Sequence, residues 1–279
     1  MSIVSSEWLN KNIDKVKIID CSWHMPYENR NPLEEYKNDH IKNAIFFDLE
    51  KNSDLNSSLP HMLTDKNSWE KIVSKMGITN NDNIVVYDNS EVISSCRCWY
   101  NFIYFGHDPN LVHVLDGGLK KWKMEKKNTT NRITNINTSS YIAKENKKLV
   151  KNKNQIDQNI IKKEFEVLDA RSRGRFEGKD PEPRKELRSG SIPNSVCLPF
   201  KECINNDNSF KKINELNYIF EKILGPKLPT NVVFSCGSGV TAAVLALAYS
   251  LINNKYLPTV YDGSWAEYGR IKKKNEKIN

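Results

Sequence analysis

An internal repeat is the feature that most constrains the fold of this chain of 279 residues. Three segments of the first half recur in the same order in the second half: KVKIIDCSW as FEVLDARS, NIVVYDNS as NVVFSCGS, and VHVLDGGLKKW as PTVYDGSWAEY. Three pairs of positions mark the repeat at separations of 149, 148 and 146 residues: Asp20 and Asp169, Asp88 and Cys236, and Asp116 and Asp262. Near-constant spacing in an unbroken order predicts a duplicated domain.

Each half alternates short β-branched apolar runs with longer segments of helical periodicity, such as SWEKIVSKMG and INELNYIFEKILG. Apolar strands that alternate with helices are typical of a parallel sheet with helices on both faces. We therefore predict an α/β protein with two tandem domains, residues 1–127 and 156–279. The segment between them, residues 128–155, is polar and poor in apolar residues, which predicts a linker that crosses the surface.

Composition argues against several classes of partner. The net charge is +8, but the lysines are dispersed and no basic motif is interspersed with aromatic residues, so we predict no nucleic-acid partner. The basic end of the chain, residues 270–279, is expected to be a solvated tail. No apolar run approaches the length of a membrane span, and the N-terminus lacks the pattern of a secretory signal, which predicts a cytoplasmic protein without membrane contact.

The six cysteines are scattered through a chain that is too large to need disulfides, which is typical of free thiols in a reducing compartment. Only Cys96 and Cys98 lie close together, as C-x-C without a second pair of ligands, so we predict no metal site. Cys236 is different, because it stands between an apolar run and a turn with two glycines. A thiol at a strand end is often simply buried and inert, so the cysteine alone does not decide its role.

The segment CGSGVTA, residues 236–242, runs into a helical pattern. Gly237 and Gly239 allow the backbone to curl with its N–H groups facing inward, and the start of a helix adds further free N–H groups and a partial positive charge. The loop is therefore predicted to stabilise negative charge on the sulfur of Cys236. A phosphatase uses a similar loop but needs an arginine at its end to hold phosphate, where this chain has Thr241 and Ala242.

Motifs along nearly the whole chain resemble those of tandem-domain rhodanese-type sulfurtransferases. The matching segments follow one another in order: FFDLEKNSDLNSSLPHML, SSCRCWYNFIYFG, LDGGLKKW, LDARSRGRFEGKDPEPR, GSIPNSVCLPF and YDGSW. The loop CGSGVTA resembles that of 3-mercaptopyruvate sulfurtransferases more than that of thiosulfate sulfurtransferases, which carry Arg and Lys after the cysteine. The resemblance implies two rhodanese-like domains, of which the second is catalytic, since the first has Asp88 in place of Cys236.

The resemblance also implies sulfur transfer in two half-reactions. The thiolate of Cys236 attacks the sulfur of 3-mercaptopyruvate, pyruvate leaves, and a persulfide remains on the enzyme. A second thiol, such as that of thioredoxin, or cyanide then takes the outer sulfur, and no cofactor is needed. A thiosulfate sulfurtransferase and a non-enzymatic persulfide carrier are the alternatives.

The family pattern assigns substrate binding to further residues. It places substrate-holding arginines at Arg175 and Arg184, and a bidentate guanidinium suits the carboxylate of the donor. The same stretch contains three arginines to which no role is assigned, namely Arg171, Arg173 and Arg188. The loop residues expected to bind substrate are Gly237, Gly239, Val240 and Thr241.

Ser238 lies two residues after Cys236 and, by family analogy, belongs to a proton relay with His61 and Glu50 of the first domain. Such a relay can deliver the proton that the departing pyruvate enolate needs. Asp48 is the alternative acid, since relatives often have Asp at the position of Glu50. A hydrogen bond that only joins the two domains is the alternative role for His61.

Overall fold

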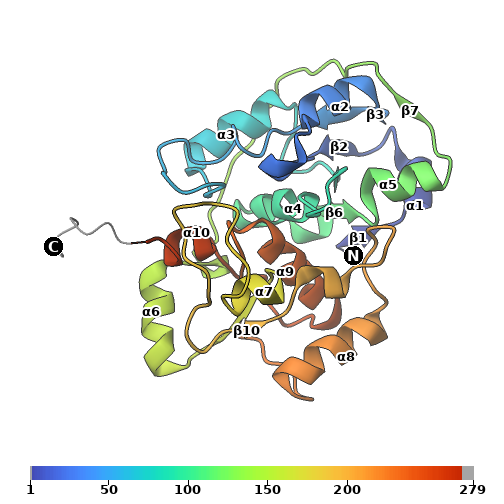
Figure 1. Ribbon diagram of the computed structural model, residues 1–279. Coiled ribbons are helices and arrows are strands. Elements are labelled where there is room, and N and C mark those ends of the chain that lie inside the picture. The colour runs from blue at the N-terminus through green and yellow to red at the C-terminus, as the bar shows by residue number, and fades with distance from the viewer. Residues whose placement is uncertain (1, 272–279) are drawn as a thin grey trace.

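In the computed structural model of the protein, residues 2–271 are described, and the expected tail beyond Ile271 lies outside the described residues. Each half of the chain forms its own five-stranded sheet, and the N-terminal half lies above the C-terminal half in Figure 1. The order of corresponding strands is the same in both sheets, which confirms the predicted α/β class and the duplication. No helix within residues 2–271 is long and apolar enough to cross a membrane.

The first sheet has the order β1-β6-β5-β2-β4, and all its strand pairs are parallel. Its strands are β1 (Ile3–Val4), β2 (Lys17–Asp20), β4 (Ala44–Phe46), β5 (Ile84–Tyr87) and β6 (Val112–Leu115). The helices of this half are α1 (Ser6–Asn12), α2 (Pro32–Asn38), α3 (Lys66–Lys75), α4 (Ser95–Tyr104) and α5 (Gly118–Met124), with the short 3₁₀ turns η1 (Pro26–Glu28) and η2 (Pro109–Leu111). A separate antiparallel pair joins β3 (His40–Ile41) to β7 (Thr129–Thr130).

The second sheet has the order β10-β9-β11-β12-β8, and its strand pairs are also parallel. Its strands are β8 (Val150–Lys151), β9 (Glu166–Asp169), β10 (Val196–Cys197), β11 (Val232–Ser235) and β12 (Val260–Tyr261). The helices are α6 (Lys153–Lys162), α7 (Arg173–Phe176), α8 (Ile213–Leu224), α9 (Val240–Ile252) and α10 (Ser264–Tyr268), with η3 (Lys147–Leu149) and η4 (Phe200–Cys203). The segment predicted as the linker, residues 128–155, thus contains β7, η3, β8 and the start of α6.

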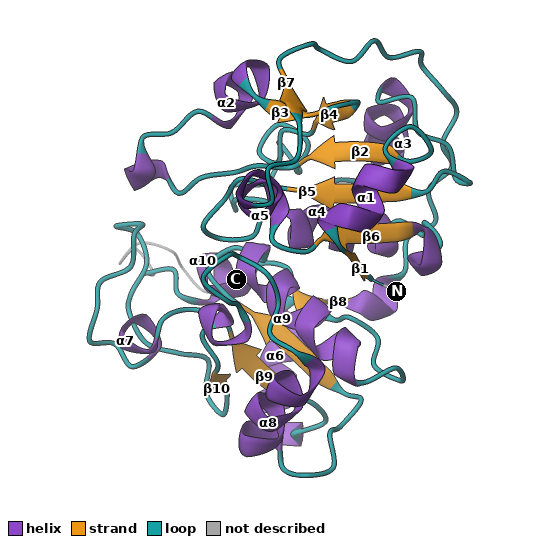
Figure 2. Ribbon diagram, turned by 90° about the vertical axis from the view of Figure 1, so that its right-hand side faces the viewer, coloured by secondary structure: helices purple, strands orange, loops and turns teal. Residues whose placement is uncertain are grey.

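The central strands β5 and β11 have the sequences Ile-Val-Val-Tyr and Val-Val-Phe-Ser, and every residue of both is buried. Figure 2 shows the strands of each half with helices packed around them. A strand that is covered on both faces reads as a continuous apolar run, which is why the sequence pattern located these two strands.

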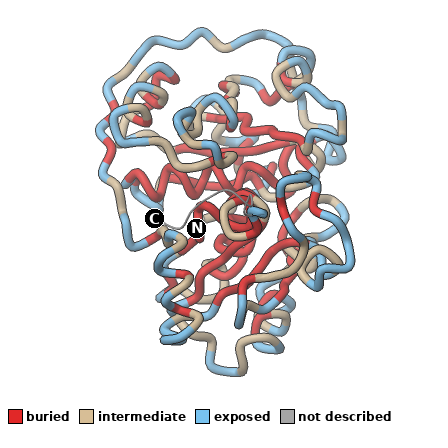
Figure 3. The backbone as a smooth tube through the Cα atoms, turned by 60° about the vertical axis from the view of Figure 1, so that its left-hand side comes forward, coloured by how far each residue is buried: buried red, intermediate tan, exposed pale blue. Residues whose placement is uncertain are grey.

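Helices α4 and α9 join the two domains. The residues of α9 from Ala242 to Tyr249 are all buried, and so is every residue of α4. A helix that is apolar around its circumference has to be covered on all sides, and α9 packs against β11 of its own sheet and against α4 of the first domain. Figure 3 shows the resulting buried region where the two halves meet. The domains therefore share one continuous apolar core.

Polar contacts at this interface repeat the internal symmetry. The carboxylate of Asp116 accepts a hydrogen bond from the backbone N–H of Phe210 at 2.8 Å, and that of Asp262 accepts one from Leu63 at 2.9 Å. Both aspartates belong to the repeated Asp-Gly motif and directly follow the last residue of a strand, β6 or β12. Each domain thus holds a loop of the other domain at the carboxyl edge of its sheet.

Candidate active site

Cys236 directly follows β11, at the carboxyl edge of the second sheet, as the sequence predicted. Only 1% of its surface is exposed, and it lines a cavity of about 350 Å³. Parallel sheets bind ligands beyond the carboxyl ends of their strands, so the cavity lies where a substrate is expected. Both domains contribute side chains to its wall, among them Trp23, Met25 and Val92 of the first domain and Arg175, Arg184 and Phe200 of the second.

The loop after Cys236 has the backbone conformation that its glycines allow. Gly239 has a φ of +78°, and α9 begins at the next residue. The N–H of Cys236 donates to Ser264 Oγ at 3.1 Å, whereas the N–H groups of Gly237, Ser238 and Gly239 have no acceptor within the described part of the chain. Together with the free N–H groups in the first turn of α9, they can share the charge of an anion on the sulfur.

The corresponding loop of the first domain shows the same donors in use. Asp88, the counterpart of Cys236, follows β5, and its carboxylate accepts hydrogen bonds from the N–H groups of Ser90 and Ser95, both at 2.9 Å. Ser95 is the first residue of α4. Backbone N–H groups of the first domain thus bind a side-chain carboxylate, while the second domain has a sulfur at this position and its loop donors have no acceptor among the described residues.

Gly239→Ala tests the geometry of the loop. A side chain disfavours a φ of +78°, and a Cβ here would meet Arg97 Nη1 at 2.5 Å. We expect the free energy of unfolding to fall by roughly 1–3 kcal/mol, and persulfide formation on Cys236 to slow, as measured by chemical denaturation and by mass spectrometry. The control is Gly225→Ala, which has a φ of +84° but open space around it and should lose stability only. Equal rates of persulfide formation in the two variants would contradict a role for the loop geometry.

The structure brings Ser238 and His61 together, although 177 positions separate them in sequence. His61 Nδ1 lies 2.9 Å from Ser238 Oγ, and the imidazole packs edge-on against the ring of Trp23 with 4.6 Å between centroids. Burial, together with the positive charges of Arg97 and Arg184, lowers the pKa of His61 to about 3. The imidazole is therefore neutral at physiological pH and able to take part in a proton relay.

The two carboxylates considered behind His61 have different surroundings. Glu50 Oε1 lies 4.0 Å from His61 Nε2 and accepts a hydrogen bond from Trp23 Nε1 at 3.0 Å, and the Glu50 side chain is 65% exposed. Asp48 instead binds the backbone N–H of Lys51 at 3.1 Å and its ammonium at 3.2 Å. Of the two, Glu50 is the one that lies within 4.0 Å of the imidazole.

The buried neutral His61 predicts how stability depends on pH. The pKa of His61 is about 3 in the folded protein, against 6.5 for an ordinary histidine, so below pH 6.5 the unfolded chain binds a proton that the folded chain does not. The contribution of His61 to the free energy of unfolding is therefore complete above about pH 6.5. It falls by up to ~1.4 kcal/mol per unit as the pH decreases below this value. We expect His61→Asn to flatten this slope in denaturant unfolding between about pH 6.5 and about pH 4. A variant as steep as the parent protein would contradict a neutral buried imidazole.

The two predicted arginines both line the cavity, but their surroundings differ. Arg175 donates through Nε and Nη2 to Glu182, with the shorter distance at 2.6 Å. Arg184 is half-buried, desolvation lowers its pKa, and no described residue pairs with its guanidinium. An unpaired cation in a cavity attracts an anion, so Arg184 is the stronger candidate for the carboxylate of the donor.

Sequence reasoning missed the ion network that supports Arg175. Glu182 has 1% of its side chain exposed and also accepts a hydrogen bond from Arg171 Nη1 at 2.6 Å. Arg171 is itself buried and pairs with Asp169 at 2.6 Å. Glu182 stands in the matched segment KDPEPR between the two predicted arginines, and its opposite charge was the available signal for such a pairing.

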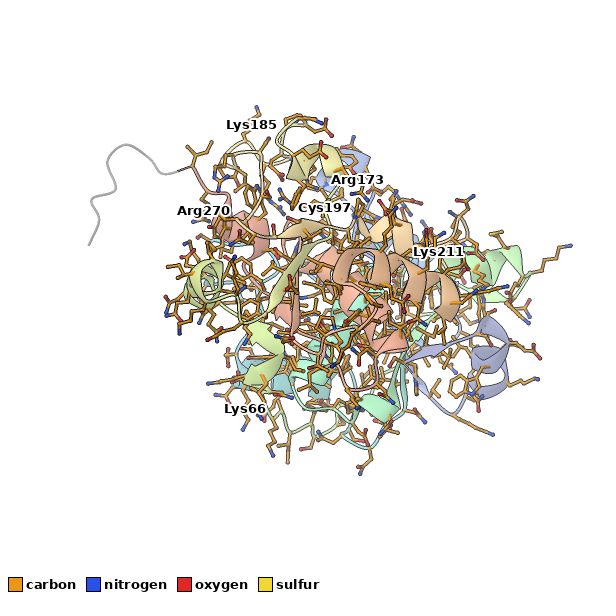
Figure 4. The ribbon with its side chains drawn as sticks, turned by 90° about the horizontal axis from the view of Figure 1, so that it is seen from below. Lys66, Arg173, Lys185, Cys197, Lys211 and Arg270 are labelled. Carbon is orange, nitrogen blue, oxygen red and sulfur yellow. The ribbon has the colours of Figure 1, made fainter. Side chains whose placement is uncertain are left out.

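A further cation lines the cavity outside the matched segments. Lys201 on η4 lines the cavity and lies 3.8 Å from Glu91 of the first domain. Arg173 on α7 and Lys185 extend from the same end of the second domain in Figure 4, and Arg173 pairs with Glu202 at 2.6 Å. Lys201 and Glu91 come from different domains, so the sequence alone could not bring them together. No group of three or more metal-ligating side chains that could hold a metal ion occurs within residues 2–271.

Comparisons with known proteins extend over both domains. The rhodanese-like domain family matches residues 5–125 and 149–270. The chain is 37% identical to the mitochondrial thiosulfate/3-mercaptopyruvate sulfurtransferase 1 of Arabidopsis thaliana, over 95% of this chain and 75% of the relative. It is 34% identical to the thiosulfate sulfurtransferase of Rattus norvegicus, over 96% of this chain and 92% of the relative.

The similarity extends to solved structures. The crystal structure of SseA from Escherichia coli, described as having the rhodanese fold, matches with a TM-score of 0.83 at 30% identity and covers 96% of this chain and 100% of its own. The match therefore includes both halves in their mutual arrangement. Two family matches in tandem and relatives above 30% identity over nearly the full length lead to one assignment. The chain belongs to the rhodanese family and is a sulfurtransferase.

Proposed function

We propose that this protein transfers the sulfur of 3-mercaptopyruvate, through a persulfide on Cys236, to an acceptor thiol. One observation carries the proposal: Cys236, loop N–H groups and the guanidinium of Arg184 border the same cavity, and within residues 2–271 these donors and this cation have no partner. This set supplies a nucleophile, donors for the charge on sulfur, and a partner for a carboxylate. The name of the Arabidopsis relative includes both 3-mercaptopyruvate and thiosulfate. The uncharged residues that follow Cys236 favour 3-mercaptopyruvate.

Substrate binding relies on the two arginines and the loop. The carboxylate of the donor pairs with Arg184, and Arg175 provides a second cation whose orientation Glu182 fixes. Gly237, Val240 and Thr241 line the cavity, and Gly239 lies between them in the same loop. In this proposal the loop holds the donor sulfur beside the thiol of Cys236. Carboxylate binding at one end and sulfur at the other orient a small keto acid for in-line attack.

In the first half-reaction, the thiolate of Cys236 attacks the donor sulfur and the bond between that sulfur and carbon 3 breaks. The electron pair of this bond stays on carbon, which gives the enolate of pyruvate. The thiol proton of the donor ends on this carbon, so the thiolate and mercaptopyruvate become a persulfide anion and pyruvate. Ser238 and His61 provide the route for the proton, with Glu50 as the proposed acid that orients the ring.

In the second half-reaction, an acceptor thiolate attacks the outer sulfur and Cys236 leaves as a thiolate. The loop N–H groups share the negative charge of both the persulfide and the thiolate, so they assist both halves of the cycle. Thioredoxin and cyanide are the acceptors we expect to act, and a panel of acceptors at saturating donor will rank them. The cytoplasm is the location we expect.

Thiosulfate is the alternative donor, since a thiosulfate sulfurtransferase is among the relatives and two cationic side chains suit a dianion. The decisive experiment compares kcat/KM for pyruvate release from mercaptopyruvate with kcat/KM for thiocyanate formation from thiosulfate. A higher value with mercaptopyruvate is expected, and a higher value with thiosulfate would overturn the choice of donor.

A non-enzymatic persulfide carrier is the alternative of a different class. Treating the purified protein with mercaptopyruvate alone distinguishes the two, because an enzyme loads its own cysteine. We expect a mass increase of one sulfur atom per chain that is absent after Cys236→Ser. A protein that stays unmodified with mercaptopyruvate, yet is loaded by a persulfide-bearing partner, would be a carrier.

A further inference from the structure

Arg97 is a fully buried arginine that the mechanism above does not use. It lies on α4 of the first domain, is 0% exposed, and reaches into the second domain. Its Nη2 donates to Asp262 Oδ1 at 2.6 Å and to the backbone carbonyl of His61 at 2.7 Å. Its Nη1 donates to the carbonyl of Gly239 at 3.5 Å. One guanidinium therefore contacts residues of both domains.

Two of these acceptors belong to the loops that carry the candidate relay, and the third supports the segment that follows His61. His61 carries the imidazole that meets Ser238, and Gly239 belongs to the loop that follows Cys236. Asp262 uses its second oxygen to accept the N–H of Leu63, two residues beyond His61. The backbone around His61 is thus held from both sides, through its own carbonyl and through the next residue but one.

The conformation of His61 explains why such a support is needed. His61 has a φ of +60°, in the left-handed region that a residue with a side chain adopts only when its surroundings hold it there. The contact between His61 Nδ1 and Ser238 Oγ depends on this backbone conformation, because it sets the direction in which the ring leaves the chain. The carbonyl that Arg97 binds is the one belonging to His61 itself.

We propose that Arg97 is a positioning residue, which holds the left-handed His61 backbone and the Gly239 carbonyl so that the imidazole meets Ser238. The kinetic test of this proposal, given below, rests on the proposed function, whereas the spectroscopic test does not. A buried ion pair is weak evidence for stabilisation, because the cost of desolvation offsets much of the attraction. Arg97 Nε has no partner among the described residues, which adds to this cost and favours a role in geometry.

The internal symmetry provides a comparison within the same chain. Asp116 is the counterpart of Asp262 and likewise accepts an N–H from the other domain. The counterpart of Arg97, at the repeat spacing of 148 residues, is the apolar Leu245. The cation that pairs with Asp116 is instead Lys121, whose Nζ lies 3.5 Å from Asp116 Oδ2 and whose side chain is 26% exposed. A fully buried guanidinium is thus found on the side of the interface that carries Cys236, although both sides dock the domains.

The kinetic test is a double-mutant cycle of Arg97→Lys and His61→Ala, assayed for pyruvate release. A lysine keeps the charge but cannot reach three acceptors as a planar fork, so we expect kcat to fall by roughly 10–100-fold with KM within about threefold. In Arg97→Met, which also loses the charge, kcat should fall further. In the His61→Ala background, Arg97→Lys should have little additional effect, because its action passes through His61. Full additivity, or an unchanged kcat in Arg97→Lys, would overturn the proposal.

The matched control is Asp116→Asn, set against Asp262→Asn. Both remove a carboxylate charge that accepts an N–H across the interface, and both should lower the Tm. Only Asp262→Asn should lower kcat and be non-additive with His61→Ala. Asp262→Asn also tests the proposal if the Arg97 variants do not fold, because asparagine keeps the size of the side chain and an oxygen that can accept from Leu63. Equal kcat in the two asparagine variants would reduce Arg97 to a structural residue.

A measurement that needs no sulfur donor separates this inference from the proposed function. The ¹⁵N resonances of the His61 imidazole report its hydrogen bond to Ser238, and we expect Arg97→Lys to shift them while Asp116→Asn leaves them unchanged. If the parent protein does not turn over mercaptopyruvate but these shifts appear, only the proposed donor fails. If turnover is found and the resonances in Arg97→Lys equal those of the parent, the positioning role fails.

Discussion

Cys236→Ser is expected to abolish sulfur transfer, with a fall in kcat of at least roughly 10⁴-fold. The loop N–H groups can share the charge of a thiolate, but a serine hydroxyl stays protonated at neutral pH and its oxygen does not take up the sulfur of the donor. The fold should persist, because the change replaces one buried sulfur by oxygen beside polar donors. Pyruvate release and the mass of the donor-treated protein measure the effect, and thermal unfolding checks the fold.

The matched control for this variant is Cys197→Ser. Cys197 is also a free, buried cysteine of the second sheet, and its Sγ lies 3.6 Å from the carbonyl of Arg171 without lining the cavity. It should keep turnover within about threefold of the parent and still gain one sulfur atom on Cys236. Substantial residual turnover in Cys236→Ser, or its loss in Cys197→Ser, would refute the assignment of the nucleophile.

Arg184→Gln is expected to lower kcat/KM for mercaptopyruvate by about 100-fold, the equivalent of about 2.8 kcal/mol. Two charge-assisted hydrogen bonds to a carboxylate are of this size. Most of the loss should appear in KM, because the carboxylate is bound in both the ground state and the transition state. Steady-state kinetics over a range of donor concentrations separates the two constants, and the free energy of unfolding should change little, since Arg184 has no described partner to leave unpaired.

Arg173→Gln provides the control for charge. Arg173 belongs to the same arginine-rich stretch, but its side chain is 54% exposed and pairs with Glu202 on the surface. Exposed ion pairs contribute little, so kcat/KM should change by less than about threefold. Equal losses in the two variants would indicate a general effect of positive charge on the approach of the anion, and the assignment of Arg184 as the binding residue would then be wrong.

The strands and the position of Cys236 could be predicted because they depend on local patterns. A run such as Val-Val-Phe-Ser is apolar because both faces of β11 are covered, and the turn that follows needs glycine because Gly239 has a positive φ. The repeat added the order of the strands, since two copies of one pattern fold in the same way. Arg184 followed from a motif, but the same motif did not indicate which of the two arginines would pair with Glu182.

By itself the sequence determined two α/β domains, a thiol at a strand end and a loop of free N–H groups, because hydrophobic periodicity and glycine conformation act over neighbouring residues. The tertiary structure alone decided that His61 contacts Ser238, that Glu50 rather than Asp48 lies within 4.0 Å of the imidazole, and that Arg97 crosses the interface between the domains. These contacts depend on how α4 and α9 pack across the two domains. The packing of two buried apolar helices is set by the shapes of many side chains at once, so no local pattern of residues encodes it.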